Sequence, residues 1–333
     1  MRKLLFVLIG LIIILNSCKQ EVSKKTNKTI ENTSVSGPVF GTSYNVIYTS
    51  EVNYTKQFDS LFDVINTSLS TYIPNSDISK LNRNEAVKVD KHFKHVFTSS
   101  KSIFKATEGV FDPTIGDVVN AWSFGADKNK FLTDSTTIDS LMRFVGFDHV
   151  KLVGNEIKKP SGAYLEFNAI AKGYAVDVIS EFLEDKNVKN YLVEIGGEIR
   201  VKGDNIEKGA PWRVGLDEPR FDGGQSVYKA INLSDEAMAT SGTYRKFKID
   251  ENGNKYAHII DTKTGYPSKT NILSVSVIAK ECMVADGYAT AFQAMGVQGV
   301  TSFLKTHPEL KVFLIFENDK KALETLALNG FPD

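Results

Sequence analysis

The 333-residue sequence has only two cysteines, Cys18 and Cys282, so at most one intrachain disulfide is possible. It lacks a cluster of cysteine and histidine residues of the kind that binds zinc. It also lacks net charge, because 40 basic and 40 acidic side chains cancel. This balance gives no indication of a nucleic-acid surface, and a small anionic ligand would need a local site.

A long apolar run occurs at the N-terminus, from Leu4 to Leu15. It has the length of a secretory signal core and is too short to span a bilayer comfortably. The following residues 15–18, Leu-Asn-Ser-Cys, resemble a bacterial lipobox; the alternative is an ordinary cleaved signal with a chance cysteine. The lipobox predicts a signal peptide at 1–17, a lipidated Cys18 that attaches the protein to a membrane of the bacterial cell envelope, and a domain outside the cytoplasm on the periplasmic side.

Residues 18–36 are rich in Lys, Glu, Thr, Asn and Ser and have few apolar side chains, so we expect a flexible tether there. The folded domain is then expected at 37–333. With Cys18 lipidated, no intrachain disulfide forms. Cys282 stands in an apolar setting without a neighbouring histidine, which favours a small packed side chain over a nucleophile.

Apolar periodicity predicts both helices and strands in the domain. Helices are expected at 54–70, 92–107, 136–144, 284–295 and 297–305, and another follows Lys172. Strands or hairpins are expected at 38–49, 149–158, 191–195, 212–216, 230–233 and 272–279, around an Asn-Gly turn at 252–253, and at 312–316 as the last strand. Because strands and helices do not alternate regularly, the pattern favours an α+β fold of mixed sheets with packed helices.

Two distant stretches carry the strongest chemical signal. Residues 165–177, Leu-Glu-Phe-Asn-Ala-Ile-Ala-Lys-Gly-Tyr-Ala-Val-Asp, place Lys172 and Gly173 where a strand end meets a helix start, a position that favours phosphate groups; a plain core helix is the alternative. Residues 286–290, Asp-Gly-Tyr-Ala-Thr, place Asp286 and Thr290 four apart, on one face of a helix. Helix capping or surface polarity is the alternative there.

Three further positions have both a functional and a structural interpretation. The Gly41-Thr42 pair interrupts a strand pattern and fits either a turn against a ligand or an ordinary bulge. Trp122 fits either stacking on a flat ligand or simple packing. His258, at a strand end, fits either a general base or a structural side chain.

Taken together, these segments resemble the ApbE family of FAD:protein FMN transferases over roughly residues 37–310. The matching motifs are Phe-Gly-Thr at 40–42, Ser-Thr-Tyr at 70–72, Phe-Asp-Pro-Thr-Ile-Gly at 111–116, Asn-Ala-Trp-Ser-Phe-Gly at 120–125, Ala-Ile-Ala-Lys-Gly-Tyr-Ala-Val-Asp at 169–177, Ile-Gly-Gly at 195–197, Thr-Ser-Gly at 240–242, His-Ile-Ile-Asp at 258–261 with Thr-Gly at 264–265, and Asp-Gly-Tyr-Ala-Thr at 286–290. Two positions depart from the family pattern, since Phe40 stands where Met is usual and Glu166 where Asp is common.

The resemblance implies a single catalytic domain with an Mg²⁺ site made of Asp286, Thr290 and backbone carbonyls at Ala169 and Ala289. An all-oxygen shell with few carboxylates suits this ion. It also implies that FAD lies against a set of residues that includes Lys172 at the pyrophosphate. This set is Phe40, Tyr72, Val110, Phe111, Asp112, Glu166, Lys172 and Ile260.

The activity implied is Mg²⁺-dependent transfer of FMN from FAD to a Thr or Ser hydroxyl of a target flavoprotein, with release of AMP. His258 is the expected base, and Asp261 is the residue expected to orient it. The expected partners are FAD and flavoprotein subunits of exported or membrane redox complexes, without nucleic acid. Two alternatives stay open: an FAD pyrophosphatase that yields FMN and AMP, and a flavin-binding lipoprotein without catalysis.

Overall fold

The structure, a computed structural model, describes residues 31–127, 133–220, 222, 224–244, 247–249 and 255–333. The predicted signal peptide, Cys18 and most of the tether lie outside these ranges, as does the predicted turn at 252–253. In the part that is described, no helix is both long and apolar enough to cross a membrane.

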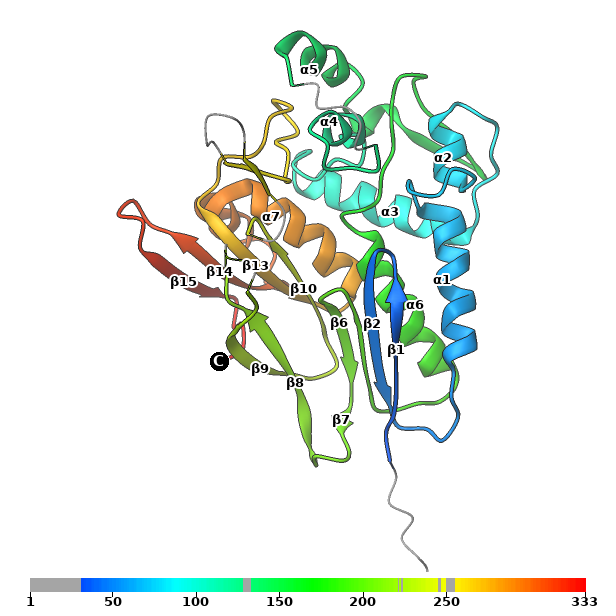
Figure 1. The fold of residues 1–333 in the computed structure, drawn as a ribbon, viewed down its shortest axis with the longest axis vertical. Helices are drawn as coiled ribbons and strands as arrows, with labels where there is room; N and C mark the ends of the chain where they lie inside the picture. The colour runs from blue at the N-terminus through cyan, green and yellow to red at the C-terminus, as the bar shows by residue number, and fades with distance from the viewer. Residues whose placement is uncertain (1–30, 128–132, 221, 223, 245–246, 250–254) are drawn as a thin grey trace, which may run out of the picture.

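An eight-stranded antiparallel sheet forms the centre of the fold (Figure 1). Its strand order is β1-β2-β5-β6-β10-β13-β14-β15. The strands are β1 (Thr33–Val39), β2 (Thr42–Tyr48), β5 (Tyr191–Ile195), β6 (Glu198–Lys202), β10 (Ala237–Gly242), β13 (Ile272–Ala279), β14 (Lys311–Glu317) and β15 (Leu323–Leu328). All eight residues of β13 are buried, because this strand lies inside the sheet with both faces covered.

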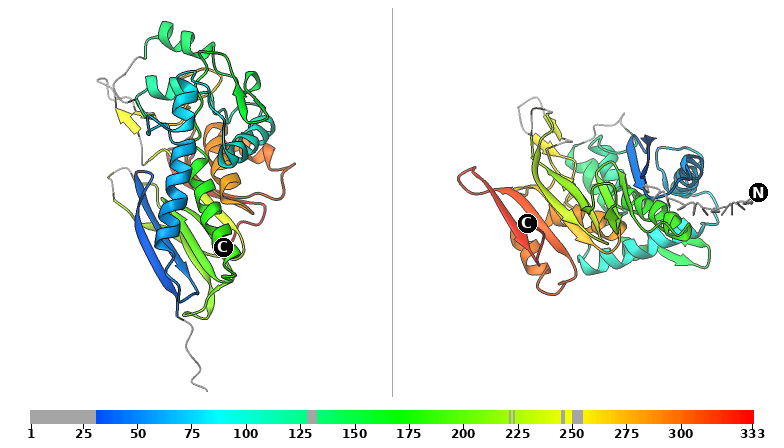
Figure 2. Two further views of the ribbon diagram at one scale, coloured as in Figure 1. Left: turned by 90° about the vertical axis from the view of Figure 1, so that its right-hand side faces the viewer. Right: turned by 90° about the horizontal axis from the view of Figure 1, so that it is seen from below.

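The two faces of the sheet pack against different layers. Helices α1 (Thr55–Leu69), α3 (Lys91–Ala106), α6 (Ala171–Asp185) and α7 (Cys282–Phe303) contribute to the main apolar core on one face (Figures 1 and 2). The other face packs against a three-stranded sheet of β7 (Asp204–Asn205), β8 (Ala210–Asp217) and β9 (Val227–Leu233). Successive side chains of β10 show this division: Ala239 belongs to the first core and Met238 to the second.

Smaller elements complete the end of the molecule at which α4 and α5 lie (Figure 1). A third apolar cluster there includes Trp122, Phe124 and Ile260. The elements are α2 (Asp77–Asn82), α4 (Gly116–Ala121), α5 (Ser135–Met142), the 3-10 turn η1 (Phe147–His149), and the short pairs β3 (Lys151–Val153) with β4 (Glu156–Lys158) and β11 (Phe247–Ile249) with β12 (Lys255–Ala257).

Helices α6 and α7 cap one another. Neither has a side-chain cap from its own N-cap residue. Instead, the Asp177 carboxylate from α6 accepts the Cys282 and Met283 N–H groups at the start of α7, at 2.9 and 2.8 Å. In return, Asp286 Oδ2 from α7 accepts the Gly173 N–H in the first turn of α6 at 3.0 Å. Each carboxylate thus satisfies donors that lack intrahelical partners in the other helix.

Most of the expected elements are confirmed. Strands β5 and β13 have the predicted bounds, and helices α1, α3 and α5 lie within two residues of theirs. The predicted hairpin turns at Gly154 and Asn155, between β3 and β4. The two helices expected at 284–295 and 297–305 are parts of α7, which has non-helical backbone angles at Gly296 (φ 71°).

Three expectations were wrong, and one helix, α2, was not expected. Residues 33–36 belong to β1 rather than to the tether, because pairing with β2 from Thr33↔Tyr48 satisfies backbone groups whatever the side chains are. Strand β15 follows the strand that was expected to be last. Helix α2 was missed because its N-cap, Ser76, belongs to a stretch of turn-forming residues that was interpreted as a loop. The chain before Lys172 forms only an isolated bridge at Tyr164, not a strand.

A methyl group at Gly173 tests the close approach of α6 and α7. An alanine Cβ there would lie 2.5 Å from the Cys282 carbonyl oxygen and 2.8 Å from Asp286 Cβ. We expect Gly173→Ala to lower the free energy of unfolding by about 1–3 kcal/mol, measured by urea denaturation. Gly215→Ala is the control, since its Cβ would meet only Val227 methyls at 3.4 Å. Equal losses in both variants would contradict this reading of the helix contact.

Candidate active site

A cavity of about 840 Å³ opens between the α6–α7 contact and the loops around α2 and α4. This volume is in the range of cofactor and small-molecule sites. Twelve of the thirteen predicted site residues line it: Phe40, Tyr72, Val110, Phe111, Asp112, Glu166, Ala169, Lys172, His258, Ile260, Asp286 and Thr290. Ala289 is buried in α7 and is not among the lining residues.

One wall of the cavity is a face of α7. Asp286, Thr290 and Ala294 follow at intervals of four residues and line the cavity together, which confirms the predicted shared face. Asp286 is buried, and no hydrogen bond from the described residues reaches its Oδ1, while Oδ2 binds Gly173. Burial, together with the nearby Glu198 carboxylate, raises the pKa of Asp286 to about 8.

Lys172 reaches the same wall from the first turn of α6. Its Nζ donates to Glu198 Oε2 at 2.5 Å, and Glu198 is buried at the start of β6. Burial by itself would lower the pKa of Lys172, but Glu198 and Asp286 outweigh it and the pKa is raised, so the side chain is an ammonium ion. Lys172 therefore lies beside two buried acidic groups, Glu198 and Asp286, at this wall.

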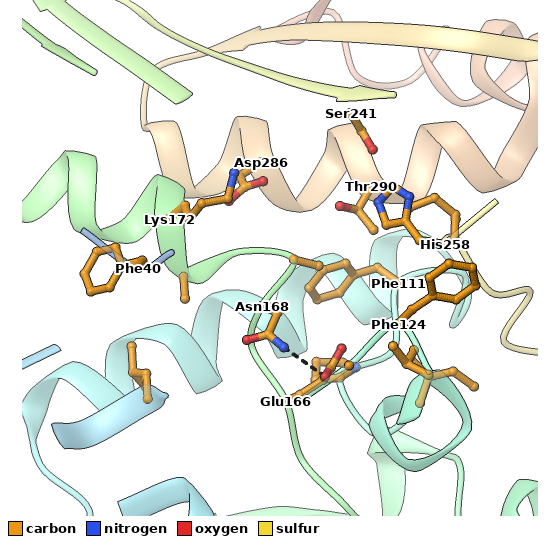
Figure 3. Close-up of a pocket in the computed structure, with 18 of the residues that line it drawn as sticks. Phe40, Phe111, Phe124, Glu166, Asn168, Lys172, Ser241, His258, Asp286 and Thr290 are labelled. Carbon is orange, nitrogen blue, oxygen red and sulfur yellow. Dashed lines mark hydrogen bonds between the residues drawn. The ribbon is translucent and has the colours of Figure 1, made fainter. Parts of the chain in front are cut away.

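His258 follows the short strand β12 and points toward the α7 wall (Figure 3). Its ring lies near Thr290 and Ser241 in that view, and 6.3 Å from the Phe124 ring, centroid to centroid. An imidazole at this position is suited to accept a proton from a group bound beside α7.

Aromatic side chains line other parts of the cavity. Phe40 lies in the two-residue β1–β2 turn at φ 48°, a left-handed conformation unusual for Phe, and its ring packs edge-on against Phe62 at 5.6 Å. Below Phe111, Glu166 Oε2 accepts a hydrogen bond from Asn168 Nδ2 at 3.0 Å (Figure 3). Tyr72 is exposed at the rim, where its ring is available to a ligand.

Asp112 lines the cavity, but its carboxylate forms hydrogen bonds within the protein. Oδ1 accepts the Thr114 N–H at 2.8 Å and the Thr114 hydroxyl at 2.6 Å, and Oδ2 accepts the Phe147 N–H at 3.2 Å. Burial raises the pKa of Asp112, against the lowering effect of these donors. The carboxylate thus holds the 111–116 loop in place, and only the surrounding backbone is available to a ligand.

Three functional interpretations from the sequence change. The Gly173 N–H is taken by Asp286 and is not open to phosphate. Trp122 is packed in the third apolar cluster, and its indole N–H donates to the Gly265 carbonyl at 2.9 Å. In this motif Phe124, and not Trp122, lines the cavity. Asp261 Oδ1 accepts the Lys263 and Thr264 N–H groups, so this carboxylate caps its own turn rather than orienting His258.

Sequence reasoning missed Glu198, Asn168, Ser241 and Phe124 as cavity residues. Ser241 and Phe124 lie inside motifs noted above, Thr-Ser-Gly and Asn-Ala-Trp-Ser-Phe-Gly, but nothing in one sequence indicated which member faces the cavity. Glu198 directly follows Gly196-Gly197, and its burial beside Lys172 depends on a contact between distant segments. Within the described residues, no group of three or more His, Cys, Asp or Glu side chains is arranged to hold a metal ion.

Comparison with known proteins adds independent information. The model of the ApbE family matches residues 40–314. The FAD:protein FMN transferase of Haemophilus influenzae is 34% identical over 329 residues, which cover 93% of this chain and 93% of that protein. The protein of the same name from Vibrio cholerae is 34% identical over 303 residues, 88% of this chain and 90% of that protein.

The fold is also similar to solved structures. The flavin transferase ApbE from Vibrio cholerae aligns with a TM-score of 0.80 and 32% sequence identity. The alignment covers 89% of this chain and 97% of that one. Fold and sequence similarity therefore extend over the same, nearly complete, length.

The structural role of the Asp112 carboxylate can be tested by Asp112→Asn. The amide nitrogen would face N–H or O–H donors and leave a buried donor without a partner, so we expect the free energy of unfolding to fall by about 1–3 kcal/mol. Asp139→Asn, at an exposed position of α5, is the control and is expected to leave stability unchanged. Unchanged stability of Asp112→Asn in urea denaturation would mean that the carboxylate is free for a ligand.

Proposed function

The chain belongs to the ApbE family and is an FAD:protein FMN transferase, and we propose that it transfers FMN to a threonine or serine hydroxyl in an Mg²⁺-dependent reaction. The observation that carries the proposal is the meeting of two distant segments at one cavity. Lys172 from α6 and Asp286 with Thr290 from α7 line a single wall, and His258 points toward it (Figure 3).

The residues of this wall fit Mg²⁺. The Asp286 carboxylate retains an oxygen without a donor, and Thr290 lies one helical turn further on along the same wall. Asp286, Thr290 and the carbonyls of Ala169 and Ala289 would hold the ion, with water and phosphate oxygens completing its shell. When bound, Mg²⁺ would supply positive charge to the pyrophosphate as its P–O bond breaks.

The chain's own residues have separate tasks in this proposal. The Lys172 ammonium binds pyrophosphate oxygens, and Glu198 holds that side chain at the wall. The aromatic side chains of Phe40, Phe111 and Tyr72 bind the flat parts of FAD, and Glu166 accepts hydrogen bonds from its hydroxyl or amino groups. These contacts orient the phosphorus of the FMN half toward the acceptor.

The transfer step is a displacement at that phosphorus. The acceptor hydroxyl oxygen forms the new P–O bond, and the bond from this phosphorus to the bridging oxygen breaks, so AMP leaves with that oxygen. His258 accepts the proton of the attacking hydroxyl. The product is an FMN phosphoester of the acceptor side chain.

The decisive experiment incubates the purified domain with FAD, Mg²⁺ and exported flavoprotein subunits, followed by mass spectrometry. We expect an FMN-sized adduct on a Thr or Ser residue, lost when EDTA is added or when Asp286 is replaced by Ala. Free FMN and AMP formed rapidly without acceptor, with no adduct on any authentic subunit, would indicate a pyrophosphatase instead. Intact FAD after prolonged incubation would indicate a binding protein without catalysis.

The role of His258 predicts a separation between binding and chemistry. We expect His258→Ala to lower the rate of FMN transfer by about 10²–10⁴-fold, since it removes the general base, with the FAD dissociation constant nearly unchanged. His149→Ala, at an exposed histidine outside the cavity, is the matched control. Loss of FAD binding together with turnover in His258→Ala would place the side chain in the flavin site instead.

We also propose that the enzyme is lipid-anchored at Cys18, on the outer side of the cytoplasmic membrane or beyond it. The lipobox-like residues 15–18 and the polar stretch after them support this location. Cys18→Ser is expected to move the full-length protein from the membrane fraction to the soluble periplasmic fraction, because it removes the lipid attachment site. Membrane association equal to that of the unsubstituted protein would rule out this anchor.

A further inference from the structure

The central sheet has an open edge inside the cavity. The ladder between β6 and β10 ends at the pair Met238↔Ile199, whereas β10 continues to pair with β13 as far as Gly242↔Ser274. The last three residues of β10 therefore extend beyond β6, are only half buried, and line the cavity. The chain before β6 turns away at Gly196-Gly197, and this leaves the edge uncovered.

The direction of the backbone groups along this edge follows from two hydrogen bonds. The Thr243 N–H donates to the Leu273 carbonyl in β13, and the Glu236 carbonyl accepts the Val201 N–H from β6. Because residues of an antiparallel strand alternate between their two neighbours, the N–H and C=O groups of Thr240 and Gly242 point away from β13, toward the cavity.

These four backbone groups have no hydrogen-bond partner within the described chain. Gly197, the residue that would face Thr240 in a longer ladder, donates its N–H to Glu194 Oε1 at 3.1 Å instead. Two donors and two acceptors thus face the cavity at the spacing of a strand edge. Such a row is a template for another strand.

The side chains of β10 divide between the two faces at this edge. Thr240 Oγ1 shares a hydrogen bond with Ser276 Oγ at 2.8 Å, so this side chain stays within the sheet. Ser241 lies on the same face as Ala239, the face toward α7. Figure 3 shows its hydroxyl beside Thr290 and His258.

We propose that the acceptor protein binds as an extended strand, antiparallel to β10, along the edge formed by Thr240, Ser241 and Gly242. This inference rests on the proposed function, because it concerns the polypeptide that receives FMN. A peptide that enters a cavity loses water from its own N–H and C=O groups, and strand addition replaces those bonds with main-chain partners. A flavin ring, which is largely apolar, finds its complement at the aromatic side chains of Phe40, Phe111 and Tyr72.

The register of this pairing is fixed by the chemistry. The modified residue stands opposite Ser241, as a pair without mutual hydrogen bonds, so that its side chain shares the face of Ser241 and its Cβ lies within about 4.5–5.5 Å of the serine Cβ. Its hydroxyl is then next to His258 and Thr290 (Figure 3). The residues immediately before and after it direct their N–H and C=O groups to Gly242 and Thr240.

Substitution at Thr240 tests the edge from the enzyme's side. Thr240→Pro removes an N–H that points into the cavity but none of the ladder with β13, a placement that proline tolerates on an edge. Thr240→Ala is the matched control, since it also loses the hydroxyl bond to Ser276 but keeps the N–H. Relative to this control, we expect the acceptor concentration for half-maximal labelling to rise roughly threefold to tenfold in Thr240→Pro, with equal FAD affinity.

A peptide series tests the register with the unsubstituted enzyme and so does not depend on the folding of a variant. The probe is a synthetic peptide spanning the residue at which mass spectrometry finds FMN. N-methylation of the residue before or after the modified one is expected to abolish labelling, because those N–H groups face β10. N-methylation of the modified residue itself is expected to be tolerated, because its N–H points away.

An equal acceptor concentration for half-maximal labelling in Thr240→Pro and Thr240→Ala would overturn strand addition. So would a peptide series in which N-methylation of the modified residue and of its neighbours has the same effect. Weaker FAD binding in Thr240→Pro would also overturn it, since the flavin would then occupy the edge. An enzyme that modifies no acceptor would overturn the transferase proposal itself. The unmethylated peptide, labelled normally, separates a failure of the inference from a failure of that proposal.

Discussion

The exchange of carboxylate caps between α6 and α7 is the interaction on which the site depends. Asp177 binds the N–H groups that begin α7, and Asp286 binds an N–H in the first turn of α6. Gly173 allows the helices to approach this closely, because a Cβ would overlap the Cys282 carbonyl oxygen. The contact brings Lys172 next to Asp286 and Thr290, although more than 100 residues separate these segments. One arrangement therefore provides both the stability of the helix pair and the cation-binding wall.

The cost of this arrangement is a concentration of buried charge. Asp177 is neutralised by Arg200 at 2.9 Å, so its role is complete within the fold. Glu198 accepts a hydrogen bond from Lys172, and the nearby Glu198 carboxylate adds to burial in raising the pKa of Asp286. Two buried acidic groups beside Lys172 suit a site that binds a divalent ion together with an anionic substrate. The open edge of β10 likewise leaves backbone groups unpaired, at the place where we propose that the acceptor segment binds.

The sequence predicted the elements with strong periodicity and the residues that meet at the cavity. Helix α3 and strand β13 follow from apolar spacing, and twelve of thirteen site residues followed from motif resemblance and line one cavity. What remained beyond prediction depends on contacts between distant segments. The Gly173 N–H is directed at Asp286 and not at a ligand, and Glu198 pairs with Lys172 across 26 residues. Strand β1 was assigned partly to the tether because its stability comes from β2 rather than from its own side chains.

A crystal structure of the domain with FAD and Mg²⁺ bound tests the central claim most directly. We expect the ion to contact Asp286 and Thr290, and the pyrophosphate to lie between the ion and the Lys172 ammonium, at the contact of α6 and α7. An ion or a pyrophosphate bound elsewhere in the cavity, with the Asp286 carboxylate engaged only by Gly173, would contradict it.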